Sequence, residues 1–366
     1  MLKKVHLLLL KTYIYMSKNL KKREIKYSEA IAEAHVLSLK KNPKAFIMGP
    51  GVADITGIFG TTKPATECFG PTRVFDTPTS ENTLTGLGVG AAVLGMHPVL
   101  VHARNDFVLL TLDQIANQAA KWSYMSGGAY KVPLLIRAII GRGWGQGAQH
   151  SQSLQSIFMH FPGLQVIMPV TPYDAKGMIL AAMESEKPVL CLEHRWLYDK
   201  IGQVPENYYL STIGKGRIAR RGKDITIVAI SQMVLEAEAA SAELEKAGID
   251  AEIIDLRSLR PLDTDLIIKS VKKTRRLMVC DTSWKSAGAS AEILALVSEL
   301  AHNALISPPV RVTSTDTPTP FAQSLEASFY PNSKVIVNTA INMLNGKSTP
   351  PSSKDIQITK PFSGPF

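Results

Sequence analysis

Three residues with chemically useful side chains stand just beyond short apolar segments of the chain. Glu81 follows the segment "RVFDTP", Phe107 follows "HPVLVHA", and His150 follows "VPLLIRAII". Carboxyl and imidazole groups are side chains that enzymes use for general acid–base chemistry. Ligands of open α/β sheets bind beyond the carboxyl ends of the strands. If the three segments are strands of one sheet, these residues mark a candidate catalytic site.

His150 lies in the loop "GRGWGQGAQHSQS", residues 141–153, in which four glycines precede the imidazole. Glycines serve tight turns or the close approach of the backbone to a ligand. The residues alone also allow structural interpretations. His150 can be an ordinary hydrogen-bonded loop residue, Ser80 can cap the helix that follows it, and Glu81 can complement the dipole of that helix. Both kinds of interpretation stay open at this level.

The segments that must position these residues alternate with helical patterns. Leu109, Leu112, Ile115, Ala119 and Trp122 recur at helical spacing, and Gly127-Gly128 supplies a stop signal. Continuous apolar strands with helices between them are typical of a mostly parallel sheet that is covered on both faces. Six segments read as buried strands: "AFIMG", "RVFDTP", "HPVLVHA", "VPLLIRAII", "LQVIMP" and "PVLCLEH".

A second α/β region follows a polar, glycine-containing connection. It opens with the strand "DITIVAI", continues through the helix "MVLEAEAASAELEKAG" and returns in "IDAEIIDL" and "RRLMVCD". We therefore predict two α/β domains at residues 24–200 and 220–345, joined by a linker at 201–219. Residues 1–23 are expected to form a basic flexible tail, and the proline-rich residues 346–366 a disordered one.

The charge and cysteine content exclude several function classes. Residues 1–26 carry +7 of the net charge of +10, and no basic stripe interleaved with aromatic residues follows, which argues against nucleic-acid binding. No run of 18 apolar residues predicts a membrane span. The first 15 residues lack the features of a signal peptide, and we expect Met16 to be the true start. Three widely spaced cysteines form neither a metal motif nor a disulfide framework, so a cytoplasmic location is expected.

From about residue 24 to 345 the chain resembles the beta subunit of the decarboxylating component of 2-oxo acid dehydrogenase complexes, of the pyruvate dehydrogenase type. That family shares its two domains with the C-terminal half of transketolase. Several segments in one order are far more specific than a single short motif. The segments are "RVFDTPTSE", "LDQIANQAAKWSYMSGG", "GAQHSQS", "PGLQVIMPVTPYDAKGM", "EHRWLY", "GKDITIVA" and "DLRSLRPLD".

The resemblance implies a fold, a cofactor and partners. It implies a pyrimidine-binding domain followed by a transketolase C-terminal domain, and thiamine diphosphate shared with an alpha subunit that holds the diphosphate and its Mg²⁺. It further implies an alpha2-beta2 heterotetramer, a lipoyl acyltransferase as a further partner, and no metal ligand in this chain. The expected reaction is oxidative decarboxylation of pyruvate or a related 2-oxo acid with acyl transfer to lipoamide.

The resemblance also assigns roles to individual residues. Glu81 matches the glutamate that hydrogen-bonds the aminopyrimidine ring of the cofactor and promotes its imino tautomer. Phe107 and Arg104 lie at the expected pyrimidine pocket. His150 matches the histidine that faces the substrate and donates a proton during acyl transfer to the lipoyl group. A glycine-rich loop before His150 would let the substrate and the lipoyl arm approach.

Three departures from the family pattern leave other functions open. Pro50 stands where the family commonly has a glutamate assigned to proton relay, Arg104 and Asn105 stand where many relatives carry an aromatic residue, and Lys187 replaces the asparagine of a potassium-binding stretch. We therefore do not expect potassium here. A transketolase-like, non-oxidative transferase that uses Arg104 to hold a phosphate or carboxylate is one alternative. A non-catalytic assembly subunit is another; Pro50 favours it, whereas the retained Glu81 and His150 count against it.

Overall fold

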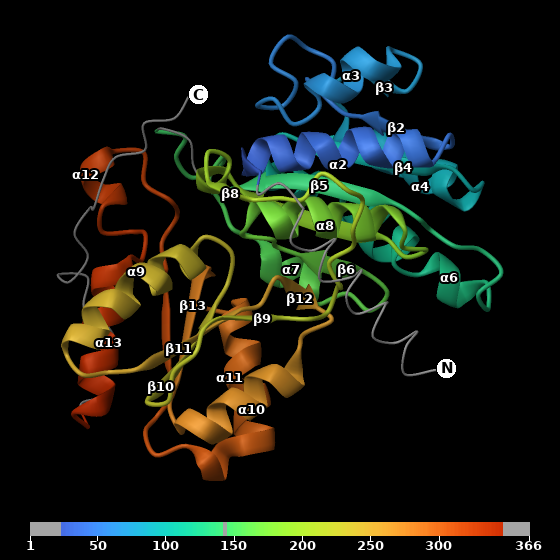
Figure 1. The fold of residues 1–366 in the computed structure, drawn as a ribbon. Coiled ribbons are helices and arrows are strands. Elements are labelled where there is room, and N and C mark those ends of the chain that lie inside the picture. Colours follow the sequence, from blue (N-terminus) through green and yellow to red (C-terminus); the bar gives the residue numbers. More distant parts are fainter. Residues whose placement is uncertain (1–22, 142–144, 347–366) are drawn as a thin grey trace, which may run out of the picture.

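A computed structural model of the chain describes residues 23–141 and 145–346. The expected N-terminal start at Met16 and nearly all of the two predicted tails therefore lie outside the described residues. The described chain forms two α/β halves, each built on its own sheet (Figure 1). The predicted fold class, two α/β units with mostly parallel sheets, is confirmed.

The N-terminal sheet has seven strands in the order β12-β6-β7-β5-β4-β2-β3, and all neighbouring pairs except β12–β6 are parallel. Every residue of β5 and of β7 is buried, as expected for central strands covered on both faces. The strands are β2 (Ala45–Met48), β3 (Val74–Phe75), β4 (His97–His102), β5 (Leu135–Ile140), β6 (Gln165–Ile167), β7 (Val189–His194) and β12 (Ser258–Arg260).

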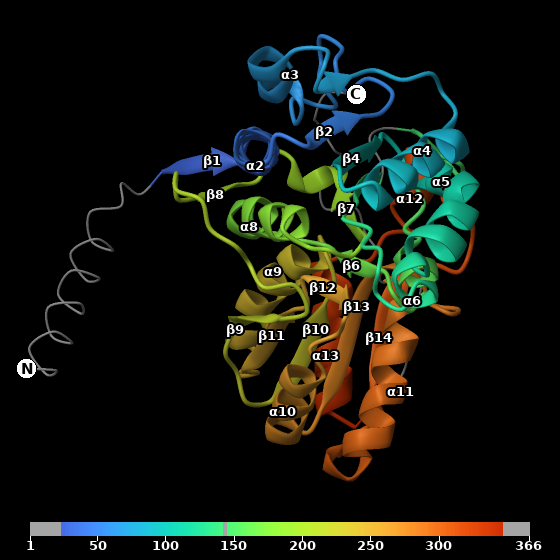
Figure 2. The same cartoon turned by 90° about the vertical axis from the view of Figure 1, so that its right-hand side faces the viewer.

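Alternate residues of these strands pack into two different apolar cores. Ile47 of β2 packs with α2 (Tyr27–Lys41) and α8 (Pro172–Met183), whereas Met48 packs on the opposite face with α4 (Glu81–Val93). Figure 2 shows the N-terminal sheet between these helices. The shorter helices of this half are α3 (Lys63–Phe69), α5 (Asn105–Val108), α6 (Trp122–Met125), α7 (Gln155–Met159) and η3 (Arg195–Leu197).

The helix predicted between β4 and β5 is present but is divided into segments. A 3₁₀ turn, η1 (Leu109–Thr111), leads into a π-helix, η2 (Asp113–Ala119), before α6 begins. Ile115 and Ala119 are buried as their spacing predicts. Apolar spacing identifies the side that faces the core, but 3₁₀, α and π turns can all place residues three or four apart on one side.

The C-terminal sheet has the order β14-β13-β10-β11-β9, and only β9 is antiparallel to its neighbour. Gly248, with φ of 75°, follows α9 as the sequence predicts. The strands are β9 (Arg217–Arg220), β10 (Ile225–Ala229), β11 (Ala251–Asp255), β13 (Leu277–Trp284) and β14 (Val310–Ser314). The helices are α9 (Met233–Lys246), α10 (Thr264–Thr274), α11 (Ala289–Ala301), η4 (His302–Ala304), α12 (Gln323–Glu326) and α13 (Ser333–Leu344).

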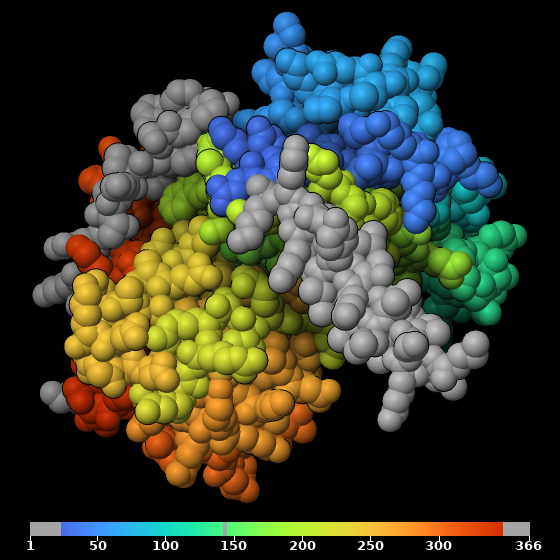
Figure 3. Space-filling model, viewed as in Figure 1, coloured from blue at the N-terminus to red at the C-terminus, as the bar shows by residue number. Residues whose placement is uncertain are grey.

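The two halves are linked more closely than a simple connection would allow. The predicted linker contains β8 (Ile201–Gln203), which pairs with β1 (Glu24–Lys26), and it contains most of β9. The strand β12 leaves the C-terminal half and joins the N-terminal sheet, where Ser258 pairs with Ile167 of β6. In the space-filling view the two halves lie directly against each other (Figure 3).

Candidate active site

Phe107 and His150 come together at the carboxyl ends of neighbouring strands. Phe107 lies in α5, directly after β4, and His150 lies in the loop after β5. Their ring centroids are 5.3 Å apart and the rings meet edge to face at 80°. The Phe107 side chain is 37% exposed and His150 is exposed, so both remain accessible to a ligand. The structure therefore brings two of the predicted site residues into direct contact.

Glu81 is the first residue of α4 and is half-buried. The alternative in which the Ser80 side chain caps this helix is wrong. Ser80 occupies the N-cap position, but its hydroxyl donates to the Thr83 hydroxyl at 3.1 Å and bonds no backbone amide of the helix. Within the described part of the chain, the Glu81 carboxylate has no hydrogen bond or ion pair. It is thus a helix-terminal carboxylate that no described residue engages.

Arg104 is almost fully buried, with 8% of its surface exposed. One guanidinium nitrogen donates to the carbonyl oxygen of Gly141 at 3.0 Å, so Arg104 holds the start of the glycine-rich loop. Burial lowers its pKa, and the nearby Asp106 carboxylate partly opposes that shift. Asn105 is fully buried, and its amide nitrogen and oxygen have no hydrogen-bond partner among the described residues.

Gly141 and Gly147 of the loop lie in different surroundings. Gly141 has φ of 72°, and a Cβ there would lie 2.6 Å from the Nε2 atom of His194. No larger residue fits without moving that ring. Gly147 has φ of 65° and lies against the exposed ring of Phe321, at ordinary contact distance from where its Cβ would be. Residues 142–144 of the predicted loop lie outside the described residues.

Asp106 anchors the segment that follows His150. Its Oδ1 atom accepts hydrogen bonds from the backbone amide of Gln152 at 3.1 Å and from the Gln152 side chain at 2.9 Å. Burial raises the pKa of the Asp106 carboxyl. We did not predict this pair from the sequence, although the carboxylate two residues after Arg104 was an indication of it.

The C-terminal half anchors the same segment. The Gln155 side-chain amide donates to Asp281 Oδ1 at 2.6 Å, and the Ser283 hydroxyl donates to the carbonyl oxygen of Ser153 at 3.0 Å. Asp281 and Gln155 are fully buried, and burial raises the pKa of Asp281 to about 6. These residues were also missed, because nothing in the sequence places residue 281 beside residue 155.

Two of the positions that depart from the family pattern lie in a turn and beside an ion pair. Pro50 follows β2 in a turn, and Glu184 of the potassium-like stretch pairs with Lys41 at 2.7 Å. No group of three or more His, Cys, Asp or Glu side chains that could hold a metal ion occurs within residues 23–141 and 145–346. In the same residues, no helix has the length and apolarity needed to cross a membrane.

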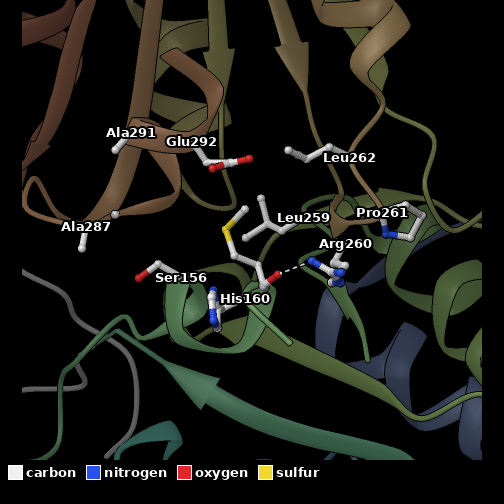
Figure 4. A pocket seen from close by; sticks show the side chains of 11 residues that line it. Ser156, His160, Leu259, Arg260, Pro261, Leu262, Ala287, Ala291 and Glu292 are labelled. Atoms are coloured by element: carbon white, nitrogen blue, oxygen red, sulfur yellow. Dashed lines mark hydrogen bonds between the residues drawn. The ribbon is translucent and has the colours of Figure 1, made fainter. Parts of the chain in front are cut away.

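A separate cavity of about 470 Å³ opens at the junction of the two halves (Figure 4). Arg260 from β12 donates to the Met159 carbonyl oxygen at its edge, at 2.8 Å, and Glu292 of α11 faces it from the C-terminal half. Neither Glu81, Phe107 nor His150 lines this cavity. The cavity therefore does not coincide with the site that the sequence predicts.

Comparison with known proteins connects this geometry to a family. The pyrimidine-binding domain of transketolase matches residues 23–200, and the transketolase C-terminal domain matches residues 214–336. The chain is 39% identical to the acetoin:2,6-dichlorophenolindophenol oxidoreductase subunit beta of Bacillus subtilis, over 88% of this chain and 98% of the relative. It is 40% identical to the mitochondrial pyruvate dehydrogenase E1 component subunit beta of Chaetomium thermophilum, over 88% of this chain and 86% of the relative.

The chain belongs to the pyruvate dehydrogenase E1 beta family. This thiamine diphosphate-dependent family is the one that the sequence segments predict, so that prediction is confirmed. A solved structure described as a split gene transketolase, inactive beta4 tetramer, has a TM-score of 0.70 and 25% identity, and covers 88% of this chain and 99% of its own. Both halves of the described structure thus have the transketolase-type fold.

Proposed function

We propose that the chain is the catalytic beta subunit of a thiamine diphosphate-dependent 2-oxo acid dehydrogenase. It would decarboxylate pyruvate or a related 2-oxo acid and pass the acyl group to lipoamide. The observation that carries this proposal is the match along nearly the whole length of E1 beta relatives. Glu81, Phe107 and His150 stand at strand ends of the matching domain, which supports an active subunit over an assembly subunit.

The described residues fit the pyrimidine end of thiamine diphosphate. Phe107 presents an accessible aromatic ring, and Glu81 presents a carboxylate that no described residue engages. Asp106 Oδ2 is buried without a hydrogen-bond partner in the described chain, as is the Ser151 hydroxyl. Buried polar atoms normally have partners, so these atoms suit a site completed by groups outside this chain. Arg104 would act indirectly, because its guanidinium holds Gly141.

When bound, thiamine diphosphate would supply a carbon nucleophile and an electron sink for the decarboxylation of a 2-oxo acid. Glu81 would hold a proton at the pyrimidine ring, and Phe107 would pack against that ring. His150 would give a proton at the substrate side during acyl transfer. An imidazole suits this task because its ring nitrogens can both accept and donate a proton.

The proposed assembly contains more than this chain. An alpha subunit, which this family implies as a partner, would hold the diphosphate and Mg²⁺. We propose an alpha2-beta2 heterotetramer in the cytoplasm, with a lipoyl acyltransferase as a further partner. The cytoplasmic proposal is supported by the free thiols of Cys68, Cys191 and Cys280.

Reconstitution with the alpha partner tests the function. The assembly is assayed with a panel of 2-oxo acids and an artificial electron acceptor, and with sugar phosphates as transketolase-type donors. Reduction of the acceptor by a 2-oxo acid supports the proposal. Turnover of sugar phosphates alone would favour the transferase alternative, and no turnover of either class would favour an assembly subunit.

A further inference from the structure

Two side-chain hydrogen bonds cross from the C-terminal half to the segment just after His150. Both come from the carboxyl end of β13. Asp281 accepts from the Gln155 side chain at 2.6 Å, and the hydroxyl of Ser283 donates to the Ser153 backbone at 3.0 Å. All four residues are buried. A strand of one half therefore holds the loop of the other half within five residues of the imidazole.

The Asp281–Gln155 pair has capacity for a second hydrogen bond. Asp281 Oδ2 and Gln155 Oε1 are buried, and neither has a partner in the described part of the chain. A proton on Oδ2 would make that atom a donor, and Gln155 Oε1 is an acceptor on the group already bonded to Asp281. Burial raises the pKa of Asp281 to about 6, so this second hydrogen bond forms below about pH 6, whereas the bond at Oδ1 needs no proton on Asp281. An acid and an amide that exchange two hydrogen bonds hold each other in one orientation.

The described glycines on the preceding side of the loop restrict its backbone little. Gly145 and Gly147 lie there with positive φ, and glycine restricts the backbone least of all residues. The His150 ring itself makes an edge contact with Phe107 and is exposed. Hydrogen bonds of Gln152, Ser153 and Gln155 anchor the segment that carries the imidazole from the following side.

We infer that Gln155 and Asp281 are positioning residues, through which the C-terminal half fixes the segment that carries His150. This inference rests on the proposed function for its catalytic consequence, since it assumes that His150 acts in acyl transfer. A misplacement of about 1 Å can cost up to ~100-fold in rate. We expect loss of the Gln155 amide to cost about 10-fold in transfer to lipoamide, because the Asp106 and Ser283 anchors remain.

The experiment compares four variants in the reconstituted assembly. Gln155→Met removes the pair and leaves Asp281 bonded to the Ser283 amide, whereas Asp281→Leu, which has as many side-chain heavy atoms as Asp but a larger volume, removes that bond as well. Asp281→Asn keeps an acceptor for the Gln155 amide and adds a donor for its oxygen, so it should retain most activity. Thr282→Val is the matched control, because this buried neighbour has a hydroxyl with no partner among the described residues. Transfer to lipoamide, cofactor proton exchange and amide hydrogen exchange of residues 148–155 are measured for each.

We expect slower transfer to lipoamide and faster amide exchange in Gln155→Met, with cofactor proton exchange unchanged. Thr282→Val should behave like the wild type. Equal damage from Asp281→Asn and Asp281→Leu would overturn the inference, as would unchanged amide exchange in Gln155→Met. If Asp281→Leu does not fold, the Gln155→Met and Asp281→Asn results still decide. If the wild type transfers nothing to lipoamide, the proposed function fails, while amide exchange still tests the positioning.

Discussion

The polar network inside the N-terminal half and the polar groups at its strand ends differ in how completely they are hydrogen-bonded. Arg137 of β5 donates twice to Glu193 of β7, at 2.5 and 2.7 Å. It also donates to His35 at 3.0 Å and to Thr61 at 3.2 Å, and the Tyr198 hydroxyl donates to Glu193 at 2.7 Å. This buried ion pair is completed entirely by the chain's own residues.

The strand ends show the opposite arrangement. Buried polar atoms of Asn105, Asp106 and Ser151 have no partner within the described chain. An unsatisfied buried polar group costs about 1–3 kcal/mol, so a folded protein keeps few of them without a reason. The contrast indicates that the chain completes the Arg137–Glu193 network itself but leaves its candidate site to be completed by a cofactor, water or the alpha subunit. The following changes test that division.

The largest effect is expected in the scaffold. Arg137→Met would leave Glu193 as an uncompensated charge in the interior and should lower the free energy of unfolding by about 3–5 kcal/mol. Denaturant titration of the full chain measures this. Lys26→Met is the control, because the Lys26–Asp199 pair is about half-exposed, is screened by water and should contribute far less. Equal losses in the two variants would show that the buried Arg137 network stabilises the protein no more than an exposed ion pair does.

The next largest effect is expected in the pH dependence of stability, through Asp281 at the junction of the two halves. Burial raises the folded-state pKa of Asp281 to about 6, above its ordinary value of 3.8, so the folded chain keeps this proton to higher pH. The contribution of Asp281 to the free energy of unfolding should therefore fall by up to about 3 kcal/mol as the pH rises from about 4 to about 6. Above pH about 6 it should not change further. The difference in unfolding free energy between wild type and Asp281→Asn, measured at pH 4.5 and 7, isolates this group. Parallel pH curves would contradict the expected shift.

A loss of about 100-fold is expected at Glu81. Glu81→Gln should slow cofactor proton exchange in the reconstituted assembly by at least ~100-fold, the usual scale for a positioned acid or base, whatever the substrate. Thermal unfolding should be nearly unchanged, because no described residue bonds this carboxylate. Normal proton exchange in this variant would place the catalytic carboxyl elsewhere.

At His150 we expect a loss of activity that is confined to one half-reaction. His150→Ala should reduce transfer to lipoamide by a similar factor while leaving cofactor proton exchange nearly intact, because the imidazole lies on an exposed loop and acts on the substrate side. Single-turnover assays of the two half-reactions separate these outcomes. Equal loss of cofactor exchange in the Glu81 and His150 variants would refute the division of labour between them.

Local sequence patterns predicted the central strands because each is a continuous apolar segment bounded by turn residues. They missed β8 ("IGQ"), β9 ("RIAR") and β12 ("SLR"), which are short and partly polar and exist only because another strand offers its edge. In the candidate site, Glu81, Phe107 and His150 could be proposed from residue type, strand ends and family resemblance. Asp281 could not, since it lies 126 residues from Gln155 and only the packing of the halves joins them.

The strand that β12 contributes to the N-terminal sheet affects how the protein can be cut or assembled. Without it, β6 would become the edge of that sheet, with unpaired backbone groups facing solvent. Open edges of this kind recruit other chains and promote aggregation. A fragment ending at residue 213 would therefore need a substitute for β12 to stay dispersed, and the separated halves should recover solubility only when they are produced together.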